Sequence, residues 1–241
     1  MLDLAFKNNT SKIVTCIQQT IVLFSDDWKM NYGLFFHTEH LTRFVECSIT
    51  GLHSELKTYA LESSFQTIIS ADASVLAKLI QVYKTLEHKD YQWTPQLKVD
   101  FVNNITQLDF TEIMLLMGQR LSSTSLRTPN AMPPVQSILY KACFSPFNGH
   151  MSMVVRAWEK HVERSNDTFW PQRKGNPEYK ENTMKEFVEV FFEAWEWWNV
   201  YKHQKHGYVF ELRIRSGHGM RWSKTGQKFI GFLEPFIEHK E

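Results

Sequence analysis

The stretch from Tyr208 to Phe236 constrains the fold most, because it departs from the helical periodicity of the rest of the chain. In its first run Phe210, Leu212 and Ile214 alternate with residues that are mostly charged, which is the period-two pattern of a strand with one apolar face. Two glycine-containing turns separate this run from two shorter ones. The sequence therefore predicts a three-stranded antiparallel meander.

The first half of the chain has the periodicity of helices. An apolar i, i+3, i+4 stripe starts at Leu41, and Thr94 followed by a proline is a typical helix start. A segment rich in Ser, Thr and Pro at 122–134 indicates a subdomain boundary or a long ordered loop. We therefore expect a helical subdomain over residues 1–124 and an α+β subdomain over 125–241, or one continuous domain that contains both.

The most aromatic segment runs from Glu178 to His206 and is predicted as one helix, because Phe187, Phe191 and Trp195 recur at helical spacing. Other aromatic residues fall on its remaining faces, which is typical of a helix buried between layers. We expect this helix to pack on the apolar face of the meander. The predicted fold class is α+β and predominantly helical, with an N-terminal helical part and helices packed on a small C-terminal three-stranded antiparallel sheet.

The charge balance argues against a protein that binds polyanions by bulk charge. The chain has 27 Lys and Arg against 26 Asp and Glu, a formal net charge of +1, and it is 43% hydrophobic. Its start does not resemble a secretory signal, and no apolar run approaches the roughly 20 residues of a membrane helix. The 3 cysteines lie far apart and form no C-x-x-C pair. We expect an intracellular, cytoplasmic protein with no membrane partner, no metal and no cofactor.

Charged residues of the predicted meander form the first candidate site. Glu211 and Arg213 share the face opposite the apolar one, and Arg221 can join them from the neighbouring strand. His218 lies at the turn between two glycines, whose amides can approach an anion. Arginines beside a carboxylate can bind a carboxylate or phosphate ligand bidentately. Cross-strand ion pairs on a solvated face explain the same residues and are the favoured alternative.

His150, His161 and Arg164 form a second candidate group, and the last two lie on the predicted helix around position 160. His161 and Arg164 are three residues apart and therefore share one face of a helix. If this helix packs beside the sheet, both side chains can reach the meander, and His161 becomes a candidate general base. Surface or structural roles for these residues are the favoured alternative.

The C-terminal segment also mixes basic and aromatic residues, among them Arg221, Trp222 and Lys224, as single-strand nucleic-acid platforms do. The near-neutral total charge and the lack of an RNP-like motif argue against that function. We therefore expect no nucleic acid among the partners.

Two motifs near the end of the chain resemble a known family signature. Residues 219–222 read GMRW and residues 229–235 read FIGFLEP, and they resemble the GxRW and FxGFLEP signature of a eukaryotic family of uncharacterised proteins. The tract 155–161, VRAWEKH, resembles the central helix of that family, and the resemblance extends over about residues 129–236. The family has no established activity, so no catalytic residue is carried over. The resemblance implies that one local arrangement contains Arg221, Trp222, Glu234 and His161.

The leading functional interpretation is a soluble binding or protein-interaction module whose site lies at the C-terminal sheet. The absence of familiar catalytic motifs and the many aromatic residues favour it. Its partner would be an unknown protein or an anionic small-molecule ligand. The candidate ligand-binding residues are Arg221, Trp222, Arg213, Glu211, His218, Glu234, His161 and Arg164.

The alternative interpretation is an enzyme that acts on an anionic small molecule with an Arg/His/Glu cluster. Arg213 and Arg221 would hold the anion. A carboxylate, from Glu211 or Glu234, and a histidine, His161 or His218, would transfer protons. This interpretation predicts one concave pocket in which these side chains converge.

Overall fold

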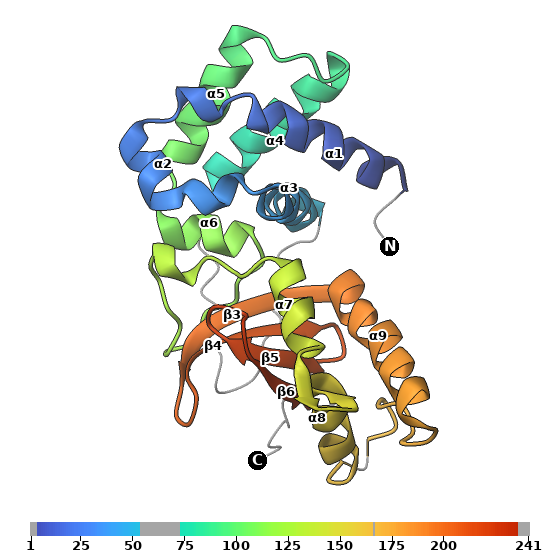
Figure 1. Ribbon diagram of the computed structural model, residues 1–241. Helices are drawn as coiled ribbons and strands as arrows, with labels where there is room; N and C mark the ends of the chain where they lie inside the picture. The colour runs from blue at the N-terminus through green and yellow to red at the C-terminus, as the bar shows by residue number, and fades with distance from the viewer. Residues whose placement is uncertain (1–3, 54–72, 166, 236–241) are drawn as a thin grey trace, which may run out of the picture. The chain divides into compact units, whose positions relative to one another are not determined.

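The computed structural model describes residues 4–53, 73–165 and 167–235. The chain divides into two compact units (Figure 1). Unit 1 contains the described residues up to Gln119 together with Arg127–Met132, and unit 2 contains Arg120–Leu126 and the described residues from Pro133 onward. The division into separate domains at residues 1–124 and 125–241 stays a prediction.

Among its described residues, unit 1 consists mainly of helices. Its α-helices are α1 (Leu4–Gln18), α2 (Asp26–Tyr32), α3 (Thr38–His53), α4 (Ala73–His88), α5 (Pro95–Thr106) and α6 (Phe110–Leu116). Short 3-10 helices are η1 (Ile21–Leu23), η2 (Gly33–Phe36) and η3 (Pro129–Ala131). Side-chain caps begin several helices: Thr94 accepts a hydrogen bond from the Leu97 amide, and Asp109 forms a capping box with Glu112. Leu41, Phe44 and Val45 of the predicted stripe are buried in α3.

Unit 2 contains three helices and the main sheet among its described residues. The helices are α7 (Gln136–Cys143), α8 (Met153–Val162) and α9 (Pro177–Ala194), and a small hairpin joins β1 (Pro146–Asn148) to β2 (Met151–Ser152). The main sheet has four antiparallel strands in the order β3 (Trp195–His203), β4 (Gly207–Ile214), β5 (Gly219–Ser223) and β6 (Phe229–Leu233). The α+β, predominantly helical fold class is therefore confirmed.

The predicted three-stranded meander is wrong by one strand, because the aromatic helix ends at Ala194 and the chain continues as β3. Trp198 pairs with Leu212 and Val200 pairs with Phe210, so alternate residues of β3 join the apolar face of the sheet. Aromatic and β-branched residues favour strands. Trp195 and Trp198 of this run have helical spacing, while Trp198 and Val200 alternate as in a strand, so its apolar residues fit both periods.

The outer edge of β3 is covered by residues 120–126 of the same unit. The Arg120 amide donates to the Trp198 carbonyl, and the Leu126 amide donates to the Val200 carbonyl. Ser125 forms an isolated antiparallel bridge with Tyr201. These contacts pair backbone groups that an exposed edge strand would leave open.

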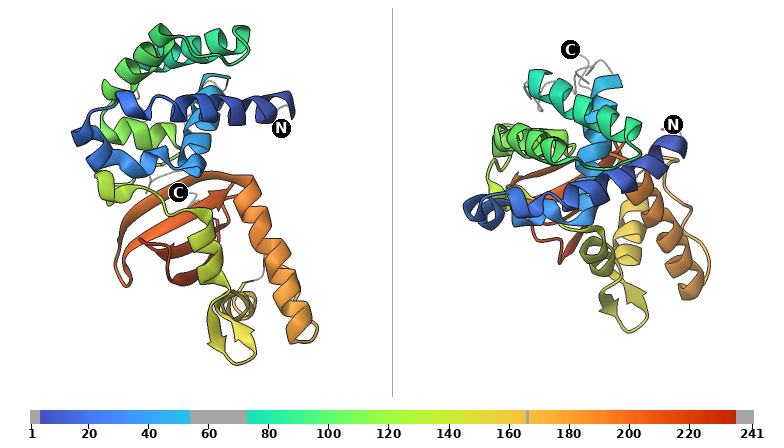
Figure 2. Two further views of the ribbon diagram at one scale, coloured as in Figure 1. Left: turned by 45° about the horizontal axis from the view of Figure 1, so that its top comes forward. Right: turned by 90° about the horizontal axis from the view of Figure 1, so that it is seen from above.

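The helices of unit 2 cover the apolar face of the sheet (Figures 1 and 2). Helix α9 brings Phe192 onto Trp222, with ring centroids 6.2 Å apart, and Phe191 near Phe232. The prediction that the aromatic helix packs on this face is confirmed for α9. Helix α7 accepts a 3.1 Å hydrogen bond at its Leu139 carbonyl from Trp222 Nε1. Helix α8 packs against β6.

No helix among the described residues is long and apolar enough to cross a membrane.

The buried Trp222 side chain gives a first test of the packing between the helices and the sheet. Trp222 to Phe removes the bond to Leu139 and part of a fully buried ring, so we expect it to lower the free energy of unfolding by about 1–3 kcal/mol. Tyr208 to Phe alters an exposed ring of β4 and should change it by no more than about 0.5 kcal/mol. Urea titrations of both variants measure the difference, and equal stabilities would contradict this packing.

Candidate active site

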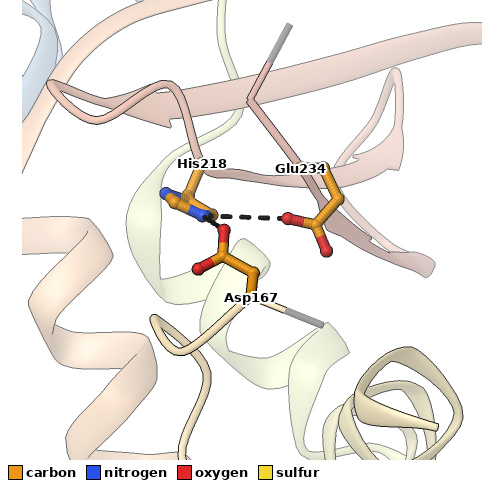
Figure 3. Close-up of side chains that lie close together, drawn as sticks. All are labelled: Asp167, His218 and Glu234. Carbon is orange, nitrogen blue, oxygen red and sulfur yellow. Dashed lines mark hydrogen bonds and ion pairs between the residues drawn. The ribbon is translucent and has the colours of Figure 1, made fainter. Parts of the chain in front are cut away.

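Four side chains from three segments of unit 2 form one cluster, which we call the histidine–carboxylate cluster: His161, Asp167, His218 and Glu234. His161 Nε2 lies 2.8 Å from Glu234 Oε1, and His218 Nε2 lies 2.7 Å from Asp167 Oδ2. His218 Nε2 is also 3.8 Å from Glu234 Oε2 (Figure 3). Glu234 therefore lies between the two histidines, and each histidine has its own carboxylate.

His218 owes its position to a tight turn between β4 and β5. Gly217 in this turn has a φ of +86°, which favours glycine. A Cβ at Gly219 would lie 2.6 Å from the Leu212 carbonyl oxygen, so a side chain does not fit there either. The predicted turn with two glycines is confirmed, and its physical requirement is this close approach of backbone to backbone.

Arg213 ties the two strand ends of the cluster together. Its Nη1 donates to the Gly217 carbonyl at 2.6 Å and to the Glu234 carbonyl at 2.9 Å. The guanidinium lies over the Trp197 ring, 5.6 Å from its centroid, and the residue is 3% exposed. Arg213 therefore fixes the distance between the His218 turn and the end of β6.

His161 reaches the cluster from the last turn of α8. Ser152 caps the start of this helix, and Trp158 Nε1 donates to the Pro171 carbonyl at 3.0 Å, which holds the loop between α8 and α9 against the helix. In that loop Trp170 Nε1 donates to Glu234 Oε1 at 3.2 Å. The loop thus supplies one wall of the site.

Aromatic rings restrict the two histidines. Phe169 stacks on the His218 ring at a centroid distance of 3.8 Å, and Trp170 contacts the His161 ring edge to face at 4.4 Å. The exposed side-chain fractions are 7% for His218 and 18% for His161. Those of Asp167 and Glu234 are 34% and 38%. Solvent and ligands therefore reach the cluster from its carboxylate side.

Hydrogen bonds set the charge of the Asp167 carboxylate. The Phe169 amide donates to Oδ1 at 2.9 Å, and this bond, followed by the bond to His218, lowers the pKa of Asp167 below its usual value. Asp167 is therefore an anion at neutral pH and fixes the orientation of the His218 ring.

A second group, which we call the sheet cluster, consists of Tyr201, Glu211 and Arg221. It lies on the face of the sheet opposite the one that the helices cover. Glu211 accepts hydrogen bonds from the Tyr201 hydroxyl and from Arg221 Nε, the latter at 2.7 Å. Burial, followed by the Glu211 charge, raises the pKa of Tyr201. Glu211 is 1% exposed, so the ion pairs predicted across this face are present but Glu211 is buried rather than solvated.

The structure separates the predicted site residues into two clusters. His161, His218 and Glu234 meet, whereas Arg221 binds Glu211 and Tyr201 instead. Arg213 contacts both clusters, because its Nε also lies 3.5 Å from Glu211 Oε2. The predicted convergence of all these side chains in one pocket is therefore wrong.

Two predicted residues stand apart from both clusters. Trp222 is buried on the helix-covered face of the sheet, where it pairs with Phe210. Its ring packs against Phe192 and Phe229, and its Nε1 donates to the Leu139 carbonyl. Arg164 follows α8 and is exposed, three residues beyond His161. No short motif indicates Asp167, which completes the histidine–carboxylate cluster, or Trp170, which donates a hydrogen bond to Glu234.

Comparison with known proteins gives one match. The family model described as the CdiA C-terminal tRNase toxin domain matches residues 141–234, which is less than half of the chain. No curated protein and no solved structure matches. The chain is therefore similar to this toxin domain from the end of α7 to Glu234.

This similarity contradicts two expectations from the sequence. A likeness to a tRNase domain conflicts with a non-enzymatic binding module and with the exclusion of nucleic acid as a partner. The enzyme alternative with an anionic substrate agrees better with it. The exclusion rested on the net charge of the whole chain, which says little about the charges gathered at one site.

The support behind His161 can be tested through Glu159, which lies on the same helix and is 4% exposed. Lys180 Nζ lies 2.8 Å and Arg173 Nε 3.5 Å from its Oε1. Burial opposes ionisation of Glu159, but these two cations outweigh it and lower its pKa. The ion pairs therefore join α8 to α9 and to the loop that carries Asp167.

Because the folded-state pKa of Glu159 is lowered, its stabilisation is present above the unfolded pKa of about 4.3 and is lost as pH falls through the folded value. We expect Glu159 to Gln to cost about 1 kcal/mol of unfolding free energy at pH 7 and less near about pH 3. Glu186 to Gln, at an exposed position of α9, is the control. A cost that does not change with pH would contradict this account.

Proposed function

We propose that the region 141–234 is a ribonuclease that cleaves tRNA. The observation that carries the proposal is the coincidence of the family match with the histidine–carboxylate cluster. All four residues of the cluster, His161, Asp167, His218 and Glu234, fall within the matched region, which ends at Glu234. Two histidines beside partly exposed carboxylates are a suitable set for moving protons at neutral pH.

The proposed reaction is an internal transesterification of the RNA backbone. The ribose 2′-oxygen attacks the adjacent phosphorus and loses its proton to a general base. The bond from phosphorus to the 5′-oxygen of the next nucleotide breaks, and a general acid gives that oxygen a proton. The products are a 2′,3′-cyclic phosphate and a free 5′-hydroxyl, so no water and no redox partner enters this step.

The roles follow from exposure and contacts. His161, together with Glu234, is the pair that exchanges a proton with RNA, because both are accessible and their 2.8 Å contact can carry one. His218, oriented by Asp167, is a positioning residue whose Nε2 faces the Glu234 carboxylate. Arg213 acts through others as a positioning residue, since it holds the backbone of the turn and of Glu234.

His161 gives the most direct test of this assignment. We expect His161 to Asn to lower kcat on tRNA by at least about 100-fold, the usual contribution of a general acid or base. His150 to Asn is the matched control, because His150 is exposed on the β1–β2 hairpin. The assay follows formation of 2′,3′-cyclic phosphate ends with each purified full chain.

Wild-type activity in His161 to Asn would contradict the proposed site. Loss of activity in Arg221 to Gln, with His161 to Asn fully active, would place the reaction at the sheet cluster instead. Products with 5′-phosphate ends would refute the transesterification itself. Circular dichroism of each variant excludes unfolding as the cause.

Arg164 is the proposed phosphate contact next to His161. It is exposed and follows the end of α8, three residues beyond His161, so a phosphate bound there would lie beside the proposed acid–base pair. We expect Arg164 to Gln to raise KM for tRNA, leave kcat nearly unchanged, and make binding less sensitive to salt. Arg156 to Gln, an exposed position that lies against Phe147, is the control. An unchanged KM and salt dependence would remove Arg164 from the binding surface.

A further inference from the structure

Asp167, His218 and Glu234 share one geometric property. In each side chain one polar atom contacts a residue outside this set of three, and a second polar atom faces the other two residues. His218 Nδ1 lies 2.8 Å from Ser216 Oγ, which leaves Nε2 facing inward. Asp167 Oδ1 accepts the Phe169 amide, which leaves Oδ2 facing His218. Glu234 Oε1 contacts His161 and Trp170, which leaves Oε2 facing His218 (Figure 3). Three potential ligand atoms therefore point toward one place.

We propose that Asp167, His218 and Glu234 form a binding site for one divalent transition-metal ion such as Zn²⁺. A nitrogen and two carboxylate oxygens from these residues lie within 4.8 Å of one another. Such a set leaves further coordination positions open for water or a ligand. The residues are far apart in the sequence, so no short metal-binding motif indicates them.

The outer contacts of these residues are those expected around a metal site. A metal-binding histidine is usually oriented by a partner at its other ring nitrogen, and ligating carboxylates are themselves hydrogen-bonded. The Ser216 hydroxyl contacts Nδ1 of His218. The Phe169 amide donates a hydrogen bond to Asp167, and the Trp170 indole donates one to Glu234. The ligands are thus oriented before an ion arrives, which lowers the entropy cost of binding.

Charge and ligand type select the ion. Two carboxylates and a neutral imidazole carry a charge of −2, which a divalent cation neutralises. Mg²⁺ and Ca²⁺ prefer oxygen ligands only, whereas an imidazole nitrogen suits Zn²⁺ and similar transition metals. The partly exposed sides of Asp167 and Glu234 provide the entry path.

The test uses Zn²⁺ alone and measures binding to the full chain by isothermal titration. We expect one ion per chain, with Kd raised at least about 10-fold in Asp167 to Asn and in Glu234 to Gln, because each loses a charged ligand. Ser216 to Ala removes only the outer partner of His218 and should also raise Kd. Co²⁺, which absorbs visible light according to its ligands, reports whether the wild-type site is formed.

The control removes a competing pair of histidines at the β3–β4 turn. The rings of His203 and His206 lie 4.9 Å apart, and a double change to Asn should leave the affinity for Zn²⁺ unchanged. Loss of binding in this double variant would overturn the proposal, as would the absence of saturable binding at millimolar Zn²⁺. These measurements contain no RNA, so their failure is distinct from failure of the proposed ribonuclease.

Discussion

The buried guanidinium of Arg213 is the interaction on which unit 2 depends most. It contacts the Glu211 carboxylate on one side and the carbonyls of Gly217 and Glu234 on the other. A charge that is 3% exposed is tolerated only when it is paired and hydrogen-bonded. Arg213 thus links the sheet cluster, the glycine turn and the end of β6. The turn carries His218 and the end of β6 leads to Glu234, so these contacts also hold the histidine–carboxylate cluster in place.

The strands from β4 onward were predictable because the residue alternation and the turn glycines indicate the same structure. Alternation marks β4, and the glycines mark the turn that carries His218. The end of the aromatic helix was not predictable, because the apolar residues after Ala194 fit both a helical spacing and the alternation of a strand. Only pairing with β4 decides between them, and pairing is a long-range property.

The candidate site divides in the same way. The family resemblance placed Arg221, Trp222, Glu234 and His161 in one local arrangement. Of these, His161 and Glu234 meet at 2.8 Å, whereas Arg221 binds Glu211 and Trp222 bonds to Leu139. Asp167 could not be found from the sequence, because a lone acid in a loop carries no periodic signal. The alternation that groups Arg213 with Arg221 is correct for the strand face, but it does not show that a guanidinium can reach around the strand end to Glu234.

The central claim is that this region breaks RNA by using the substrate's own 2′-hydroxyl. The most direct measurement compares an RNA that the full chain cleaves with the same RNA carrying a single 2′-deoxynucleotide at the cleaved position. The account predicts cleavage of the first and none at that position in the second, because the attacking oxygen is missing. Equal cleavage of both would contradict it.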